Sequence, residues 1–158
     1  MFKKLKPYII SIAIALAVGG LAAFFTRNSM DIYKTIDRPP LSPPSILFPI
    51  VWTILYVLMG ISAALVYNKK GVNYNQVSVA LSVYAISLFL NFWWSIIFFN
   101  ARMYLFAFVW IILLIISVAL TIYKYWSISK PAAILQIPYL LWVIFAAYLN
   151  FGIYILNK

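Results

Sequence analysis

The charged residues of this chain are few, and they leave long uncharged segments between them. These segments cover residues 7–26, 39–68, 71–101, 103–123 and 131–157, with lengths of 20, 30, 31, 21 and 27 residues. A helix needs about 20 apolar residues to cross the hydrocarbon core of a bilayer. Each segment therefore has room for one membrane-spanning helix, and none has comfortable room for two. We expect an all-α integral membrane protein, folded as a bundle of five transmembrane helices.

The composition excludes most classes of soluble protein. Only 9% of the residues are charged, against about 25% in soluble domains, so the chain could not cover a surface that faces water. In lipid, only helices and closed barrels satisfy the backbone, and the bulky run at 109–116 lacks the alternation of a barrel strand. The net charge of +10 is scattered along the chain, which argues against a nucleic-acid partner.

We place the five helices near residues 7–25, 47–67, 77–99, 103–125 and 132–156, with a long loop at about 26–46, in one domain that covers residues 1–158. The basic start and apolar run of the first segment also fit a signal peptide. An apolar run of 19 residues is long for such a peptide, however, so we favour a first transmembrane helix.

The loop charges predict the orientation of the bundle. With five spans, seven basic residues and no acidic residue share the N-terminal side, namely Lys3, Lys4, Lys6, Lys69, Lys70, Lys124 and Lys130. The other side carries five basic residues together with Asp31 and Asp37. Loops rich in lysine and arginine stay in the cytoplasm, so we expect a cytoplasmic N-terminus. The basic inner loops and the lack of a mitochondrial-type presequence suit a bacterial plasma membrane.

The loop at 26–46 is the one long connection. Four prolines lie among residues 39–44, and such a stretch cannot be helical and is stiff. Two interpretations are open. The loop is either a plain connector or a semi-rigid lid over the mouth of a cavity, as long loops in compact proteins often are. We favour the lid.

Within the predicted spans, polar and aromatic side chains recur on single helix faces, at steps of three and four residues. These faces contain Trp52 and Tyr56 on the second helix, Tyr84, Ser87, Asn91, Trp94 and Ser95 on the third, and Trp142, Phe145, Ala146 and Leu149 on the fifth. A neutral amide such as Asn91 is costly in lipid without a partner. It must therefore either bond to another helix or face a ligand pocket.

Small residues on the first predicted helix suggest close packing. Ala15, Gly19 and Ala23 recur at a spacing of four, which lets another helix approach closely. The partner would be either a second copy of the chain or, as we favour, another helix of the same chain.

The chemistry available to the chain is limited. It has no Cys and no His, and its carboxylate side chains are two aspartates. This removes thiolate chemistry, the commonest general base and the commonest metal ligands, so no metal site is expected. Walls of Trp, Tyr and Phe with few hydrogen-bonding groups suit a flat, apolar, aromatic molecule.

Three stretches together resemble the motifs of a known family. They contain Arg38-Pro39, Pro43-Pro44, Val51-Trp52, Leu55-Tyr56 and Met59-Gly60; then Asn91, Trp94 and Phe98-Phe99-Asn100-Ala101-Arg102; then Pro138-Tyr139-Leu140, Trp142, Phe145-Ala146 and Leu149-Asn150. The combination, spread over residues 33–150, resembles the TspO/MBR family, also known as tryptophan-rich sensory protein, translocator protein or peripheral benzodiazepine receptor.

The resemblance implies a homodimer, a cavity closed by the first loop, and binding of porphyrins such as protoporphyrin IX, with sterols bound by some members. For bacterial members it also implies light-dependent breakdown of protoporphyrin. We therefore expect a membrane receptor for porphyrins and related hydrophobic ligands, with protoporphyrin IX as a ligand and no cofactor. The alternative is a transporter or exporter of hydrophobic metabolites such as tetrapyrroles or sterols.

The resemblance also assigns residues. The ligand contacts would fall on Tyr33, Pro43, Pro44, Trp52, Asn91, Trp94, Ser95, Trp142, Phe145, Ala146 and Leu149. The paired tryptophans tied to porphyrin breakdown would fall on Trp52 and Trp142. Because the spans hold no acid–base or nucleophile–base pair, any catalysis would rest on the photochemistry of the ligand itself. Leu41 stands where the family usually has a Trp in its proline loop.

Overall fold

The computed structural model describes residues 2–158, and within that range every regular element is helical. The elements are α1 (Phe2–Thr26), α2 (Met30–Thr35), α3 (Leu47–Tyr67), α4 (Tyr74–Ser95), the π-helical turn η1 (Ile96–Asn100), α5 (Tyr104–Trp126) and α6 (Lys130–Asn157). Five helices are long and apolar enough to cross a membrane, with η1 continuing α4. The prediction of an all-α bundle with five transmembrane helices is confirmed.

Three of the long helices, α1, α5 and α6, extend beyond the uncharged segments that predicted them, whereas α3 and α4 lie inside theirs. α1 begins at Phe2 and contains three lysines, and α4 begins at Tyr74 rather than near residue 77. Charged and polar residues end the apolar run of a helix. The helical hydrogen bonds can continue past them, as they do in α1, where the chain lies outside the hydrocarbon. A charge gap therefore shows where a helix crosses the lipid, but it does not fix the length of that helix, which exceeds the gap for α1 and falls short of it for α3.

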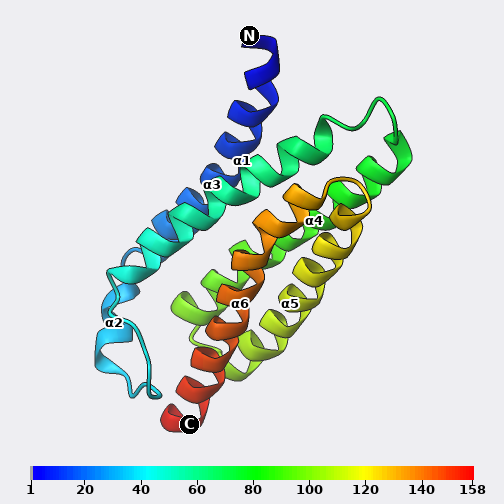
Figure 1. The fold of residues 1–158 in the computed structure, drawn as a ribbon. Helices are drawn as coiled ribbons and strands as arrows, with labels where there is room; N and C mark the ends of the chain where they lie inside the picture. The colour runs from blue at the N-terminus through cyan, green and yellow to red at the C-terminus, as the bar shows by residue number, and fades with distance from the viewer. Residues whose placement is uncertain (1) are drawn as a thin grey trace.

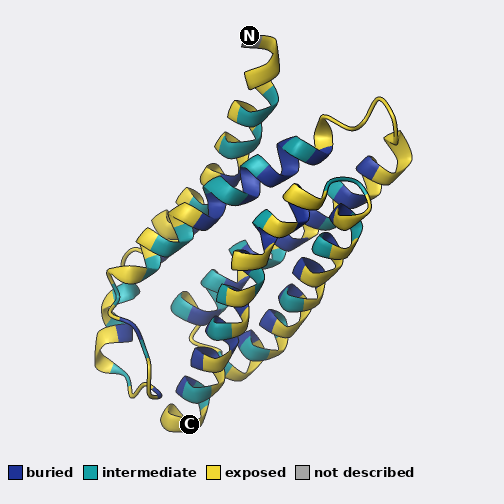
Figure 2. Cartoon of the chain, viewed as in Figure 1, coloured by how far each residue is buried: buried dark blue, intermediate teal, exposed yellow. Residues whose placement is uncertain are grey.

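The helices pack in a connected series. α1 lies against α3, α3 against α6, α6 against α5, and α5 against α4 (Figure 1). The N-terminus and the link between α3 and α4 lie at one end, and α2 and the C-terminus lie at the other (Figure 1). Buried positions face the interior of the bundle, and large apolar residues cover much of its outside (Figure 2). In a bilayer, that outer surface contacts acyl chains.

The long loop contains a short helix that the proline content did not predict. α2 precedes the proline-rich stretch, and residues 37–44 are not helical, as their prolines require. Tyr33 of α2 is buried, and its hydroxyl donates a hydrogen bond to the Pro43 carbonyl at 2.8 Å. Leu41 is 83% exposed and has a φ of 71°. The loop is therefore folded back on itself through Tyr33.

The proline-rich stretch is docked on the C-terminal part of α6. The Asn157 side chain donates to the Asp37 carbonyl at 2.7 Å and accepts from the Asp37 amide at 3.1 Å. The Tyr148 hydroxyl donates to the Pro40 carbonyl at 2.5 Å. Pro39 lies so close to Gly152 that a side chain there would overlap its ring. Contacts with α6 thus hold the loop at this end of the bundle.

Candidate ligand-binding site

A cavity of about 350 Å³ lies between α1, α3, α4 and α6. It occupies the half of the bundle nearer to α2, because its residues come from the C-terminal part of α1 and the N-terminal part of α3. Its walls are formed by Gly19, Ala22, Ala23, Thr26, Arg27, Met30, Phe48, Pro49, Trp52, Tyr56, Trp94, Ser95, Phe99, Trp142 and Ala146.

Aromatic rings form the wall contributed by α3 and α6. Trp52 and Trp142 lie with their ring centroids 6.4 Å apart and their planes at 87°. Tyr56 stacks on Trp52 at 5.6 Å, and Phe48 meets Trp142 edge-on at 6.1 Å. The indole nitrogen of Trp142 is buried and has no hydrogen-bond partner. The wall therefore presents two nearly perpendicular indole rings, and the buried Trp142 N–H behind it is unpaired within the described part of the chain.

The opposite wall is smooth because α1 contributes small side chains. Gly19 lies directly against the Tyr56 ring, and even a methyl group at this position would overlap the ring. The Thr26 hydroxyl donates a hydrogen bond to the Ala22 carbonyl of the same helix at 2.8 Å. The small residues at spacing four on α1 thus serve contact with α3 of the same chain, and Gly19 and Ala23 also line the cavity.

One charged side chain lines the cavity. Arg27 is exposed at the end of α1, where its guanidinium carbon lies 3.9 Å from the centroid of the Phe24 ring and Nη1 donates to the Phe24 carbonyl at 2.8 Å. Guanidinium groups bind carboxylates well. The site is consequently an apolar, aromatic hollow with a single positive charge beside it.

Five of the residues assigned from the sequence line this cavity, namely Trp52, Trp94, Ser95, Trp142 and Ala146. Others stand one layer behind. Tyr33 meets the cavity residue Phe48 at 5.0 Å, and the Phe145 ring lies 5.4 Å from the Trp142 ring. Pro43 is buried beneath Tyr33 in the loop, Pro44 is exposed, and Leu149 is buried inside the bundle.

Asn91 lies outside the cavity lining. It is 1% exposed, and its amide donates to the Tyr139 hydroxyl at 3.2 Å, which joins α4 to α6. Trp94 combines both roles, because it lines the cavity and its indole N–H donates to Asn150 Oδ1 at 2.9 Å. The sequence left two interpretations of Asn91 open, a bond to another helix or a contact with a ligand. The structure shows the bond to another helix.

Sequence reasoning missed the contribution of α1 and of the first turn of α3. Gly19, Ala22 and Ala23 resemble ordinary packing residues, and Arg27 resembles an ordinary loop charge. Phe48 and Pro49 lie at the start of a span, where aromatic residues are common in any membrane protein. The small residues at spacing four on α1 could have predicted that this helix lines the cavity. A helix that presents small side chains to a tryptophan-rich face leaves a hollow between the two.

Two further cavities lie elsewhere in the bundle. One of about 490 Å³ is formed by α1, α3 and α4 near the N-terminal end, with Lys6, Ser11 and Tyr84 among its residues. The other, of about 750 Å³, lies between α4 and α5. Beside the 490 Å³ cavity, α1 and α3 come into close backbone contact, since Gly60 rests on Ile12.

The model of the TspO/MBR family matches residues 11–156 of this chain. The chain belongs to the TspO/MBR family. It is 42% identical to a tryptophan-rich protein TspO of Chlorobaculum tepidum, over 99% of both chains. It is 40% identical to the TspO of Archaeoglobus fulgidus, over 94% of this chain and 95% of that one. It is also 37% identical to the translocator protein of Ovis aries, over 75% and 70% of the two chains.

TspO/MBR membership confirms the resemblance that the proline loop and the tryptophan-rich stretches predicted. Because the match spans residues 11–156, it includes the C-terminal part of α1, nearly all of the other four long helices, the loop with α2 and every residue that lines the cavity. The cavity is therefore part of the region that this chain shares with the family.

Proposed function

We propose that this chain is a membrane receptor that binds porphyrins, above all protoporphyrin IX, and related flat hydrophobic molecules in the cavity between α1, α3, α4 and α6. The observation that carries the proposal is the perpendicular pair of Trp52 and Trp142, which faces a smooth wall of small residues on α1. A planar macrocycle can stack on one indole while its edge meets the other.

The residues present fit a metal-free porphyrin. The walls are apolar, the Trp142 N–H is unpaired within the described part of the chain, and Arg27 can meet a propionate at the margin. The volume of about 350 Å³ is at the low end of ligand pockets, which span about 300–1,000 Å³. We expect a molecule as broad as a tetrapyrrole to move the loop as it enters. The chain has no His or Cys to ligate iron, so metal-free porphyrin should bind better than haem.

Binding can be tested by the quenching of tryptophan fluorescence with protoporphyrin IX in detergent. Trp142→Ala removes one indole of the pair together with its unpaired N–H. The affinity of this variant for protoporphyrin IX should fall at least about tenfold, which corresponds to a loss of roughly 1.4 kcal/mol of binding free energy. Trp93→Ala is the matched control, because Trp93 is 41% exposed on the outside of the bundle. Equal affinities for the two variants would overturn the proposed site.

Light-dependent breakdown of the bound porphyrin is the further part of the proposal. The indoles of Trp52 and Trp142 are electron-rich groups placed where an excited macrocycle would lie, and this geometry supports them as its reaction partners. Bleaching of protoporphyrin IX under illumination should be slower with Trp52→Phe/Trp142→Phe than with wild type, when both proteins are loaded to the same occupancy. Identical bleaching rates would refute the role.

A specific observation favours transport or export as a second candidate. The cavity near the N-terminal end shares α1, α3 and α4 with the proposed porphyrin site. Two hollows along the same three helices are an arrangement that passage across the membrane would need. Protoporphyrin flux into sealed vesicles that depends on the protein would support a transporter, whereas binding without flux supports a receptor.

We also propose a homodimer in a bacterial plasma membrane with the N-terminus in the cytoplasm. The family resemblance supports the dimer, and the seven lysines at the N-terminal end support the orientation. Chemical crosslinking in native membranes, followed by sizing in denaturing gels, tests the dimer directly.

A further inference from the structure

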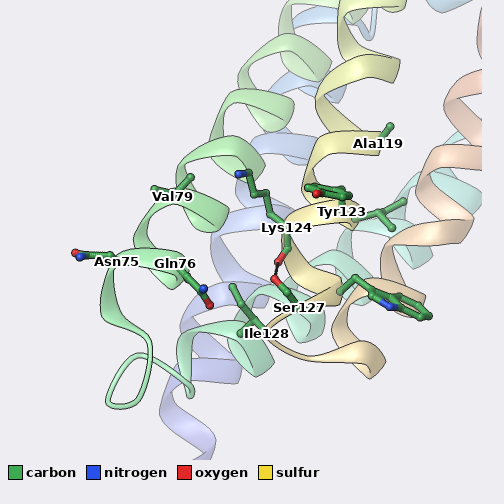
Figure 3. A pocket seen from close by; sticks show the side chains of 10 residues that line it. Asn75, Gln76, Val79, Ala119, Tyr123, Lys124, Ser127 and Ile128 are labelled. Atoms are coloured by element: carbon green, nitrogen blue, oxygen red, sulfur yellow. Dashed lines mark hydrogen bonds between the residues drawn. The ribbon is translucent and has the colours of Figure 1, made fainter.

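The cavity of about 750 Å³ lies far from the proposed porphyrin site, between the N-terminal part of α4 and the C-terminal part of α5. Its surface is mixed, with amide and hydroxyl groups near the end of the bundle and apolar side chains above them. Figure 3 shows Gln76 directed from α4 toward Ile128 and Ser127, and Lys124 extending from α5 into the space beside α4.

Lys124 is a cation without a partner. It is half-buried, and among residues 2–158 its ammonium has no hydrogen bond, no ion pair and no aromatic ring beneath it. Of the other lysines at this end, Lys70 and Lys130 each lie over an aromatic ring. The rest are exposed, namely Lys3, Lys4, Lys6 and Lys69. A half-buried ammonium group costs free energy unless an anion or water meets it. The Lys124 ammonium therefore calls for a negative group from outside the described chain.

The protein cannot supply that negative group at this end. Its only acidic side chains are Asp31 and Asp37, and both belong to the loop at the opposite end of the bundle. A second copy in the same orientation would carry its aspartates at that far end too. The anion must come from another molecule in the headgroup layer of the membrane.

We propose that the cavity between α4 and α5 binds one anionic phospholipid. Its phosphate is held by the Lys124 ammonium, and the Gln76 amide faces the polar end of the same cavity, where the rest of the headgroup would lie. Its acyl chains lie along the apolar part of the cavity, against Val79, Ala119 and Ile122. Trp126 and Tyr123 flank the site at the level where amphipathic rings prefer to lie.

The position of the cavity favours a lipid over a free anion. The cavity opens between two transmembrane helices, and its apolar residues continue toward the middle of the bundle, where an inorganic phosphate has nothing to contact. Tyr123 and Trp126 are 73% and 49% exposed, so they border the lipid rather than the core. A molecule with both a phosphate and acyl chains matches both parts of the surface.

The test uses the full-length protein in a neutral detergent, titrated with phosphatidylglycerol, with phosphatidylcholine and with inorganic phosphate, while bound lipid is counted by native mass spectrometry. Wild type should retain one phosphatidylglycerol in preference to phosphatidylcholine. Lys124→Gln should weaken phosphatidylglycerol binding roughly fivefold, since a basic residue near anionic lipid contributes about 1 kcal/mol. Lys124→Arg should retain the lipid.

Lys70→Gln is the matched control. It removes the same charge from the same end of the bundle, but Lys70 is exposed and lies over Tyr67, outside this cavity. It should leave phosphatidylglycerol binding unchanged. The proposal fails if Lys70→Gln weakens binding as much as Lys124→Gln does, if phosphatidylcholine binds equally well, or if millimolar phosphate displaces the lipid.

Discussion

Asn91 illustrates how a single intramembrane amide can be structural while it lies close to a binding site. It belongs to the same helix face as Trp94, yet its amide bonds to Tyr139 and its side chain is shut away from the cavity. Trp94, one turn further along, does line the cavity. Periodicity places the two residues on one face, but the position of the neighbouring helix decides which of them reaches the ligand.

We expect Asn91→Leu to lower stability and to leave porphyrin binding nearly unchanged. The substitution removes one hydrogen bond between α4 and α6, and such bonds in membrane proteins contribute about 0.6–2 kcal/mol. Thermal unfolding in detergent should show a lower midpoint, while fluorescence quenching should give an affinity within about twofold of wild type. A tenfold loss of affinity without loss of stability would instead make Asn91 a ligand contact.

Two glycines allow a second test at the scale of single residues. A Cβ added to Gly60 would lie 2.5 Å from the Ile12 Cα, so α1 and α3 would have to separate. One added to Gly20 would meet nothing within 4 Å. Gly60→Ala should therefore destabilise the bundle by about 1–3 kcal/mol through overpacking. Gly20→Ala should be neutral or stabilising by up to about 1 kcal/mol, because alanine favours the helix. Equal unfolding midpoints would contradict the close α1–α3 contact.

Helices are connected by a few buried side chains, and Asn150 is the most connected of them. It accepts from the Trp94 indole at 2.9 Å and donates to the Tyr104 carbonyl at 2.7 Å, so it ties α6 to α4 and α5 at once. Asn157, two turns later on the same helix, makes its bonds to the loop through Asp37. The two asparagines of α6 thus hold different elements in place.

Asn150→Ala and Asn157→Ala should have separable effects. The first loses two buried interhelical hydrogen bonds, so we expect about 1–3 kcal/mol of lost stability and a lower unfolding midpoint. The second removes the two hydrogen bonds between α6 and Asp37 but leaves the Tyr148–Pro40 bond in place, so it should loosen the loop and raise protease cleavage near residues 37–44 with little change in the midpoint. Limited proteolysis and thermal unfolding of both variants measure the two effects. A stable Asn150→Ala protein would show that packing alone joins these helices.

The elements differ in how well the sequence predicted them. The long helices followed from the charge gaps, because backbone groups in lipid must be satisfied within a helix. α2 could not be predicted, since its six residues are stabilised by tertiary contacts of Tyr33 rather than by a local pattern. In the cavity, the tryptophans were predicted by their chemistry. The cavity residues of α1 were missed because a small side chain has no polar or aromatic group that would indicate a ligand. Whether it lines a cavity depends on which side chains lie opposite to it.

At the scale of the whole molecule, five spans put the two ends of the chain on opposite sides of the membrane. The end with the N-terminus also holds the proposed lipid site, and the half of the bundle toward the other end holds the loop and the proposed porphyrin cavity. If the lysine-rich end faces the cytoplasm, anionic lipid and porphyrin would approach the protein from different leaflets. The two sites could then be occupied at the same time.

The orientation can be measured cleanly because the chain has no cysteine. Leu41 in the loop and Val72 in the α3–α4 link are 83% and 82% exposed, and they lie at opposite ends of the bundle. In intact bacterial cells, a membrane-impermeant maleimide should label Leu41→Cys and should leave Val72→Cys unlabelled until the cells are opened. This result follows from the excess of lysine on the Val72 side. The reverse labelling pattern would put the porphyrin cavity on the cytoplasmic side, and labelling of both variants would mean that the protein inserts in two orientations.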